Sequence, residues 1–146
     1  EDPLALESEL FSTILAFDII EHISNEPQFL KELFRVSQPG ALMIGSVPHD
    51  DDQFLPAYNL TFNHRRDVTH KRYYTPELLS ENLASAGFVQ TIIRKEGTVS
   101  PQVIAEFFPP ALRFFIKKCV GGLRRVGLIS TARLSSDLFF VTYKPK

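Results

Sequence analysis

Two carboxylates and an imidazole stand close together at Asp18, Glu21 and His22. Residues three apart share a face of a single helical turn, so these side chains can point in one direction. Such a set can bind a hard cation, with a distant histidine such as His64 or His70 completing it. Alternatively, the two carboxylates cap or salt-bridge the loop, and His22 packs beneath a neighbouring segment.

All four histidines of the chain lie between residues 22 and 70. Three of them belong to the segment 48–74, which lacks clear periodicity and is longer than the roughly 12–15 residues at which structureless loops become uncommon. This segment is predicted to be a lid or a substrate-binding wall, and a surface loop held by Arg–Asp pairs is the alternative. The candidate substrate-binding residues are His49, Tyr58, His64, Arg66 and Tyr73.

The residues around these side chains predict a strand, a helix and a second strand. An apolar run of strand length occupies 13–17, and 24–27 carries the capping side chain and first-turn proline of a helix start. Apolar residues at helical spacing continue to a turn expected at 38–40. Residues 41–47 then read as a buried strand that ends at Pro48.

A second helix is predicted between Thr75 as its cap and Gly87 at its end. Strands follow at 88–94 and 137–143. Alternating strands and helices with short connections predict a parallel sheet with helices packed on it. Because ligands bind beyond the carboxyl ends of such strands, adjacent first and second strands would bring the histidines to one rim.

The composition is that of one soluble globular domain, with 146 residues of which 44% are hydrophobic and 23% charged. No run reaches the ~18 uncharged apolar residues of a membrane span. The lone cysteine, Cys119, excludes an internal disulfide framework and fits a reducing, cytoplasmic compartment. There is no G-x-G-x-x-G motif and no phosphate loop, and no nucleic-acid partner is expected.

Charge is distributed unevenly, with a net −8 over residues 1–93 and a net +7 over residues 94–146. Residues 103–128 look helical, with breaks expected at the Pro109-Pro110 and Gly121-Gly122 pairs. The stretch 111–126 is basic and amphipathic, so it could lie on an anionic membrane surface as a peripheral contact. The favoured interpretation is that it covers one face of its own sheet, with its cationic side chains directed outward.

Several motifs, taken in order, resemble the carboxyl-terminal half of class I S-adenosylmethionine-dependent methyltransferases. The matching stretches are 11–23 for the fourth strand, 29–40 for the following helix and its K-P-G-G turn, 42–48 for the fifth strand, and 67–88 for the next helix and strand. Gln38 and Ala41 depart mildly from the usual turn. The resemblance covers 4–94, and 98–134 look like a helical insertion before the last strand.

The resemblance implies a partial Rossmann-like methyltransferase fold over 1–146, an α/β domain with a mostly parallel sheet, flanking helices and an antiparallel last strand. It places Ala16, Phe17 and Asp18 beside the methionine end of S-adenosylmethionine, and the segment 48–74 beside the acceptor. The glycine-rich first loop and the ribose-binding acidic residue of the family would precede Glu1. The missing N-terminal half of the domain is therefore an expected partner, and this stretch alone is expected to be inactive.

The D-x-x-E-H arrangement is also similar to the magnesium-binding E-x-x-E-H of certain O-methyltransferases. On that resemblance, the candidate Mg²⁺ ligands are Asp18, Glu21, His22 and His70.

These observations together predict S-adenosylmethionine-dependent methyl transfer to an oxygen of a small molecule, a quinone precursor or a glycan. Displacement at a sulfonium needs positioning and exclusion of water, and an oxygen acceptor must also lose a proton. His22 and His70 are the candidate catalytic residues, either as bases or as metal ligands. The alternative is a non-catalytic α/β module that docks on a membrane or a partner through the helix 111–126.

Overall fold

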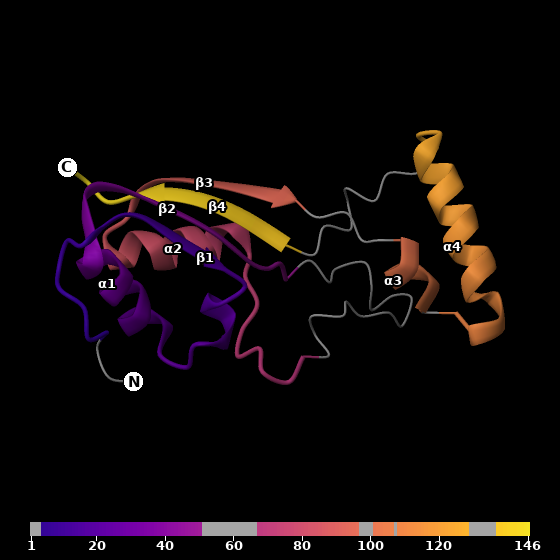
Figure 1. Ribbon diagram of the computed structural model, residues 1–146, viewed down its shortest axis with the longest axis horizontal. Helices are drawn as coiled ribbons and strands as arrows, with labels where there is room; N and C mark the ends of the chain where they lie inside the picture. The colour runs from indigo at the N-terminus through magenta and orange to yellow at the C-terminus, as the bar shows by residue number, and fades with distance from the viewer. Residues whose placement is uncertain (1–3, 51–66, 97–100, 107, 129–136) are drawn as a thin grey trace.

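The computed structural model describes residues 4–50, 67–96, 101–106, 108–128 and 137–146, which contain a four-stranded sheet in the order β1-β2-β4-β3 (Figure 1). The strands are β1 (Phe11–Phe17), β2 (Ser37–Pro48), β3 (Val89–Glu96) and β4 (Asp137–Tyr143). β1 and β2 are parallel neighbours, whereas β4 runs antiparallel to both β2 and β3. The prediction of parallel strands with an antiparallel last strand is therefore confirmed.

The helices α1 (Glu26–Val36) and α2 (Pro76–Ala86) begin at the predicted caps. The side chains of Asn25 and Thr75 accept hydrogen bonds from the amides of Gln28 and Leu78. Gly87 ends α2 at a φ of 108°, a left-handed conformation that glycine adopts without strain. α1 ends at Val36, before the predicted turn at 38–40. Those residues are counted within β2, where Gly40 has a φ of 78° and the pairing with β1 shifts in register.

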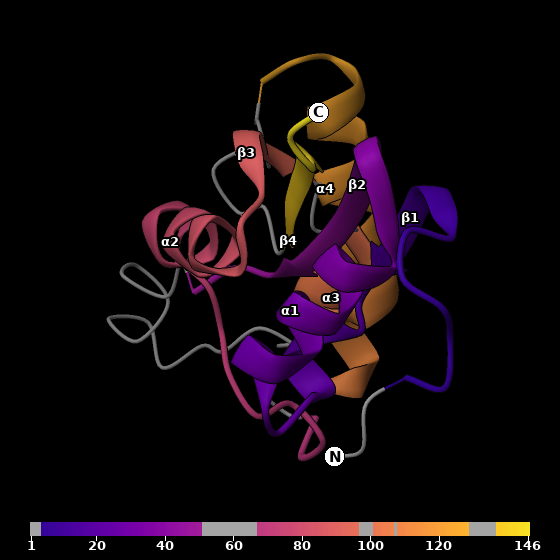
Figure 2. The same cartoon turned by 90° about the vertical axis from the view of Figure 1, so that its left-hand side faces the viewer.

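The core lies between the sheet and these two helices, which pack on the same face (Figures 1 and 2). Its buried side chains are Ala16, Ile20, Leu30, Leu33, Met43, Val47, Tyr74, Leu79, Leu83, Phe88, Leu138 and Phe140. On the opposite face Leu15 is 61% exposed and Ile92 56%, and Phe17 and Phe139 are also exposed. In the part of the chain that the structure describes, α1 and α2 thus cover one face of the sheet, and its other face exposes apolar side chains.

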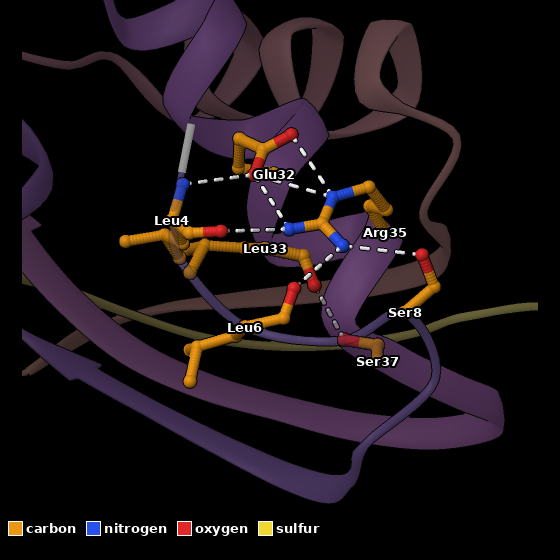
Figure 3. A network of polar contacts seen from close by, with 7 residues as sticks. All are labelled: Leu4, Leu6, Ser8, Glu32, Leu33, Arg35 and Ser37. Atoms are coloured by element: carbon orange, nitrogen blue, oxygen red, sulfur yellow. Dashed lines mark hydrogen bonds and ion pairs between the residues drawn. The ribbon is translucent and has the colours of Figure 1, made fainter. Parts of the chain in front are cut away.

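The segment before β1 is held onto α1 by the guanidinium group of Arg35 (Figure 3). It donates to the carbonyl oxygens of Leu4 and Leu6, at 3.1 and 3.0 Å, and to the hydroxyl of Ser8 at 3.1 Å. Glu32, one turn earlier on α1, pairs with the same group at 2.9 Å. One cation on α1 therefore fixes the path by which the chain enters β1.

Close packing between strands predicts a large effect at Gly45 of β2. A Cβ at this position would lie 2.3 Å from the carbonyl oxygen of Ala16 and 2.6 Å from the Phe140 ring. Gly45→Ala is expected to lower the free energy of unfolding by about 1–3 kcal/mol or more, because both neighbours belong to the packed sheet. Urea denaturation followed by circular dichroism measures the loss. Gly122→Ala is the control, since nothing lies within 4 Å of its added Cβ, and an equal loss there would contradict the steric explanation.

Helices α3 (Pro101–Glu106) and α4 (Pro110–Arg125) occupy the predicted basic region. The favoured interpretation that this helix covers the sheet is wrong, because α4 lies beyond the end of the sheet and none of its residues is buried (Figure 1). The break expected at Gly121-Gly122 is also wrong, since α4 continues through both residues. No helix in the described ranges is both long enough and apolar enough to cross a membrane.

Candidate functional site

The ends of β1 and β2 meet at one edge of the sheet, as their parallel pairing requires. After β1, Asp18 adopts a positive φ of 50° and leads into the 3-10 turn η1 (Ile20–His22). The segment 67–74 runs beside this turn and is tied to both strand ends. The amide of Lys71 donates to the carbonyl of Glu21 at 2.8 Å, and the amide of Tyr74 donates to that of Pro48 at 3.1 Å. The predicted common rim is therefore present.

A pocket of about 300 Å³ opens at this rim. It is lined by Asp18, Glu21, His22, Pro48, Asp67, His70 and Asp137. These residues come from the end of β1, the end of β2, the segment 67–74 and the start of β4. Four of the seven side chains are carboxylic acids, so the pocket favours a positively charged ligand.

Within the pocket, Glu21, His22 and His70 form a group whose potential ligand atoms all lie within 4.8 Å of one another. The rings of the two histidines lie edge to face with their centroids 4.7 Å apart. Glu21 is only 1% exposed, and its Oε2 is buried without a hydrogen-bond partner. The Nδ1 of His70 is likewise buried and unpartnered. Unpaired buried atoms of this kind are costly unless a ligand occupies the site.

The imidazole of His22 is held by a polar chain that starts at Asp67. The Thr69 hydroxyl donates to Asp67 Oδ1 at 2.6 Å and lies 3.0 Å from Nδ1 of His22. Because the hydroxyl has one proton and gives it to Asp67, it accepts a hydrogen bond from the Nδ1–H of His22. In neutral His22 the lone pair is then on Nε2, which lies 3.9 Å from Glu21 Oε1. His22 is thereby oriented to act as a base or a ligand through Nε2.

The pKa values of Glu21 and Asp67, two carboxyl groups of this pocket, are shifted in opposite directions. Burial raises the pKa of the Glu21 carboxyl above its ordinary value, and the nearby Asp18 raises it further. Hydrogen bonds from the hydroxyl and amide of Thr69 lower the pKa of Asp67. Asp18 accepts a hydrogen bond from the hydroxyl of Ser46 at 2.7 Å and lies outside the group of three close ligand atoms.

The other predicted site residues lie in different surroundings. Ala16 is buried in β1, and Phe17 is exposed at the strand's end with its ring 6.4 Å from that of Phe139. His49 is buried, forms an isolated parallel β-bridge with Tyr74, and does not line the pocket. Tyr73 is half-buried, with its ring centroid 6.1 Å from that of His70. Tyr58, His64 and Arg66 lie outside the described residues.

Sequence reasoning missed three residues of the pocket region, Asp67, Thr69 and Asp137. The Asp-x-Thr spacing before His70 is typical of a turn in which the aspartate accepts from the backbone two residues on, and this local signal could have been used. The Asp67 side chain indeed accepts from the amide of Thr69 at 2.9 Å. Asp137 reaches the pocket because β4 lies beside β2, which no local pattern indicates.

No protein-family model matches the chain. It is 33% identical over 89 residues to a probable S-adenosylmethionine-dependent methyltransferase of Mycolicibacterium smegmatis, a match covering 58% of this chain and 31% of that protein. A solved S-adenosylmethionine-dependent methyltransferase from Archaeoglobus fulgidus superposes with a TM-score of 0.58 at 16% identity, over 96% of this chain and 62% of that one. The Haemonchus contortus phosphoethanolamine N-methyltransferase 2, in complex with S-adenosyl-L-methionine, gives a TM-score of 0.55 at 16% identity, over 97% and 35%.

These similarities confirm the resemblance to S-adenosylmethionine-dependent methyltransferases. The fold is that of part of a Rossmann-like methyltransferase domain. The chain spans 31% of the length of the curated relative that it matches.

Proposed function

We propose that the chain is part of a methyltransferase that transfers a methyl group from S-adenosylmethionine to an oxygen of a small molecule, such as a quinone precursor or a glycan. The observation that supports this most is the convergence of Glu21, His22 and His70 at the carboxyl ends of two parallel strands. That position is where open α/β sheets bind ligands, and the chain is similar to such enzymes in sequence and in fold.

The residues of this chain would position the acceptor and remove its proton. S-adenosylmethionine, when bound, supplies a methyl group on a positively charged sulfonium. Ala16 and Phe17, at the end of β1, would border its methionine end, and the acceptor would enter the pocket beside His22. Where no cation is bound, the Nε2 of His22 would take the proton of the acceptor, while Asp67 and Thr69 hold the ring in place.

An oxygen acceptor meets an electrostatic difficulty in this pocket. A hydroxyl that loses its proton becomes an anion, and the four carboxylic acids of the lining oppose that change. A divalent cation held by Glu21, His22 and His70 would lower the pKa of the acceptor hydroxyl. It would also give the buried Oε2 of Glu21 a partner. Two imidazoles and one carboxylate suit Mn²⁺, Fe²⁺ or Zn²⁺ better than Mg²⁺, which prefers oxygen ligands.

A second candidate function is methyl transfer to an amine. The same four carboxylic acids would attract a protonated amine, which needs no metal and only has to lose its proton to an imidazole. The Haemonchus contortus relative is named as an N-methyltransferase. The two candidates differ in their dependence on a divalent cation.

We also propose that polypeptide outside this chain completes the cofactor site. β1 is an edge strand of the described sheet. The sheet also has an uncovered apolar face, which carries a hollow of about 430 Å³ over β2, β4 and β3 that is lined by Ile44, Ile92, Arg94, Phe139, Phe140, Val141 and Tyr143. Doubly wound α/β sheets carry helices on both faces, so an additional layer of this kind would bury the surface.

The test compares the 146-residue chain with a longer protein that carries it. We expect the longer protein to transfer a labelled methyl group from S-adenosylmethionine to a hydroxyl acceptor, with loss of transfer on chelation of divalent cations. The shorter chain should show no micromolar binding of S-adenosylmethionine by calorimetry. Transfer to amines that survives chelation would favour the second candidate. A longer protein that neither binds S-adenosylmethionine nor transfers its methyl group would refute both.

A further inference from the structure

The helix α4 is unusual in its surroundings. It extends from Pro110 to Arg125, packs against the short helix α3, and has no buried residue. Figure 1 places it beyond the end of the sheet at which β3 ends, and the pocket lies at that same end of the parallel strands. A helix in this position contributes little to the described core, so its residue pattern needs another explanation.

Charge on α4 has a single sign. The helix contains no aspartate or glutamate, and its cations are Arg113, Lys117, Lys118, Arg124 and Arg125. Five positive charges within sixteen residues give this helix a local positive potential, which attracts an anionic surface.

The apolar residues of α4 gather on one side. At 100° per residue, Leu112, Phe115, Ile116, Cys119 and Leu123 fall within a single arc of the helix. Phe115 is 64% exposed, and Leu112 and Leu123 are exposed beside it. Ile116 and Cys119, on the same side, are half-buried. Three exposed apolar residues on one side of a helix, unlike a scattered apolar residue, mark an interaction surface.

A basic hollow lies on the other side of α4 from the stripe, at 100° per residue. It measures about 680 Å³ and is lined by Pro101, Phe114, Lys117, Lys118, Gly121, Gly122 and Arg125. The ammonium of Lys118 stands 5.7 Å from the centroid of the Phe114 ring, and Phe114 itself is 73% exposed. The cations of α4 therefore occupy its polar side and flank the apolar stripe on both edges, as in helices that lie in a membrane interface.

We propose that α4 docks the protein on an anionic lipid surface. The apolar stripe would enter the headgroup region, while the cations on either side of it contact lipid phosphates, which is the arrangement of helices that lie in a membrane interface. A nucleic acid would use the cations and leave the apolar stripe exposed to water. Docking through α4 is independent of methyl transfer, since no residue of the catalytic pocket takes part.

The experiment is co-sedimentation of the chain with phosphatidylcholine vesicles, with and without phosphatidylserine, at low and high salt. We expect binding that requires phosphatidylserine and weakens with salt. Lys118→Glu should reduce the affinity about tenfold or more, because a cation near the surface is replaced by an anion. Phe115→Ser should also weaken binding. Lys31→Glu on α1 makes the same charge change at an exposed site away from α4 and should bind as the parent does.

Circular dichroism is the control that tests whether each variant retains its helical content. Equal binding to neutral and anionic vesicles, no binding to either, or an unchanged affinity of Lys118→Glu would overturn the proposal. If the protein pellets without vesicles and Phe115→Ser abolishes that pelleting, the stripe mediates self-association instead. None of these results depends on whether the longer protein transfers a methyl group, so docking and catalysis can fail separately.

Discussion

Arg72→Ala is expected to lower the free energy of unfolding by about 3–5 kcal/mol, because it leaves a buried carboxylate without its cation. The carboxylate belongs to Glu26, which is 2% exposed at the start of α1 and forms an ion pair with Arg72. The guanidinium also donates to the carbonyl oxygens of Ile23 and Ser24, at 3.1 and 2.9 Å. The second oxygen of Glu26 accepts from Asn82 of α2 at 2.9 Å.

This ion pair also bears on the functional site. Arg72 lies in the segment that carries His70, so its contacts with the start of α1 hold that segment against the turn containing His22.

The loss of stability in Arg72→Ala can be measured by urea unfolding followed by circular dichroism. Arg94→Ala, which removes an exposed arginine from β3, should change stability by no more than about 0.5 kcal/mol. The double variant Arg72→Met with Glu26→Gln should lose less than the sum of the single changes. A loss below about 1 kcal/mol for Arg72→Ala would show that Glu26 is satisfied without it.

Local signals predicted those parts of the fold that depend on neighbouring residues. Asn25, Thr75 and Gly87 mark helix ends because each makes its hydrogen bond, or takes its conformation, within a few residues. The predicted break at Gly121-Gly122 failed for an energetic reason. A glycine costs a helix only about 1 kcal/mol relative to alanine, so two of them do not end a helix of sixteen residues.

The location of the site could be predicted from the sequence, because it follows from the adjacency of β1 and β2. Parallel neighbours must deliver the segments after them to one rim, which is why His22 and His70 could be paired from sequence. The buried state of Glu21 and the chain from Asp67 through Thr69 to His22 could not be predicted in this way. They depend on how the segment 67–74 lies against η1, and that is set by long-range contacts such as the Arg72–Glu26 pair.

The largest effect on activity is expected at the two histidines. In a longer protein that carries this chain and transfers methyl groups, His22→Ala and His70→Ala should each lower kcat/KM by roughly 10²–10⁴-fold, the contribution of a positioned base or of a lost ligand. Lys71→Ala, an exposed neighbour in the same segment, should leave the rate near that of the parent. Near-parental rates in both histidine variants would refute a catalytic role for the pair.

The same variants distinguish a base from a metal ligand. If His22 acts as a base alone, Glu21→Gln should keep most of the activity, and Mn²⁺ should neither bind in calorimetry nor raise the rate. If Glu21, His22 and His70 hold a cation, all three variants should lose Mn²⁺ binding together with activity, because a site with two remaining ligands binds divalent cations weakly.

Thr69 allows a separate test of how His22 is oriented. Thr69→Ala removes the acceptor for Nδ1–H of His22 and should change the pH profile of the rate, whereas Thr69→Ser keeps the hydroxyl and should restore it. A Thr69→Ala profile identical to that of the parent would mean that the Asp67–Thr69 chain does not set the orientation of His22.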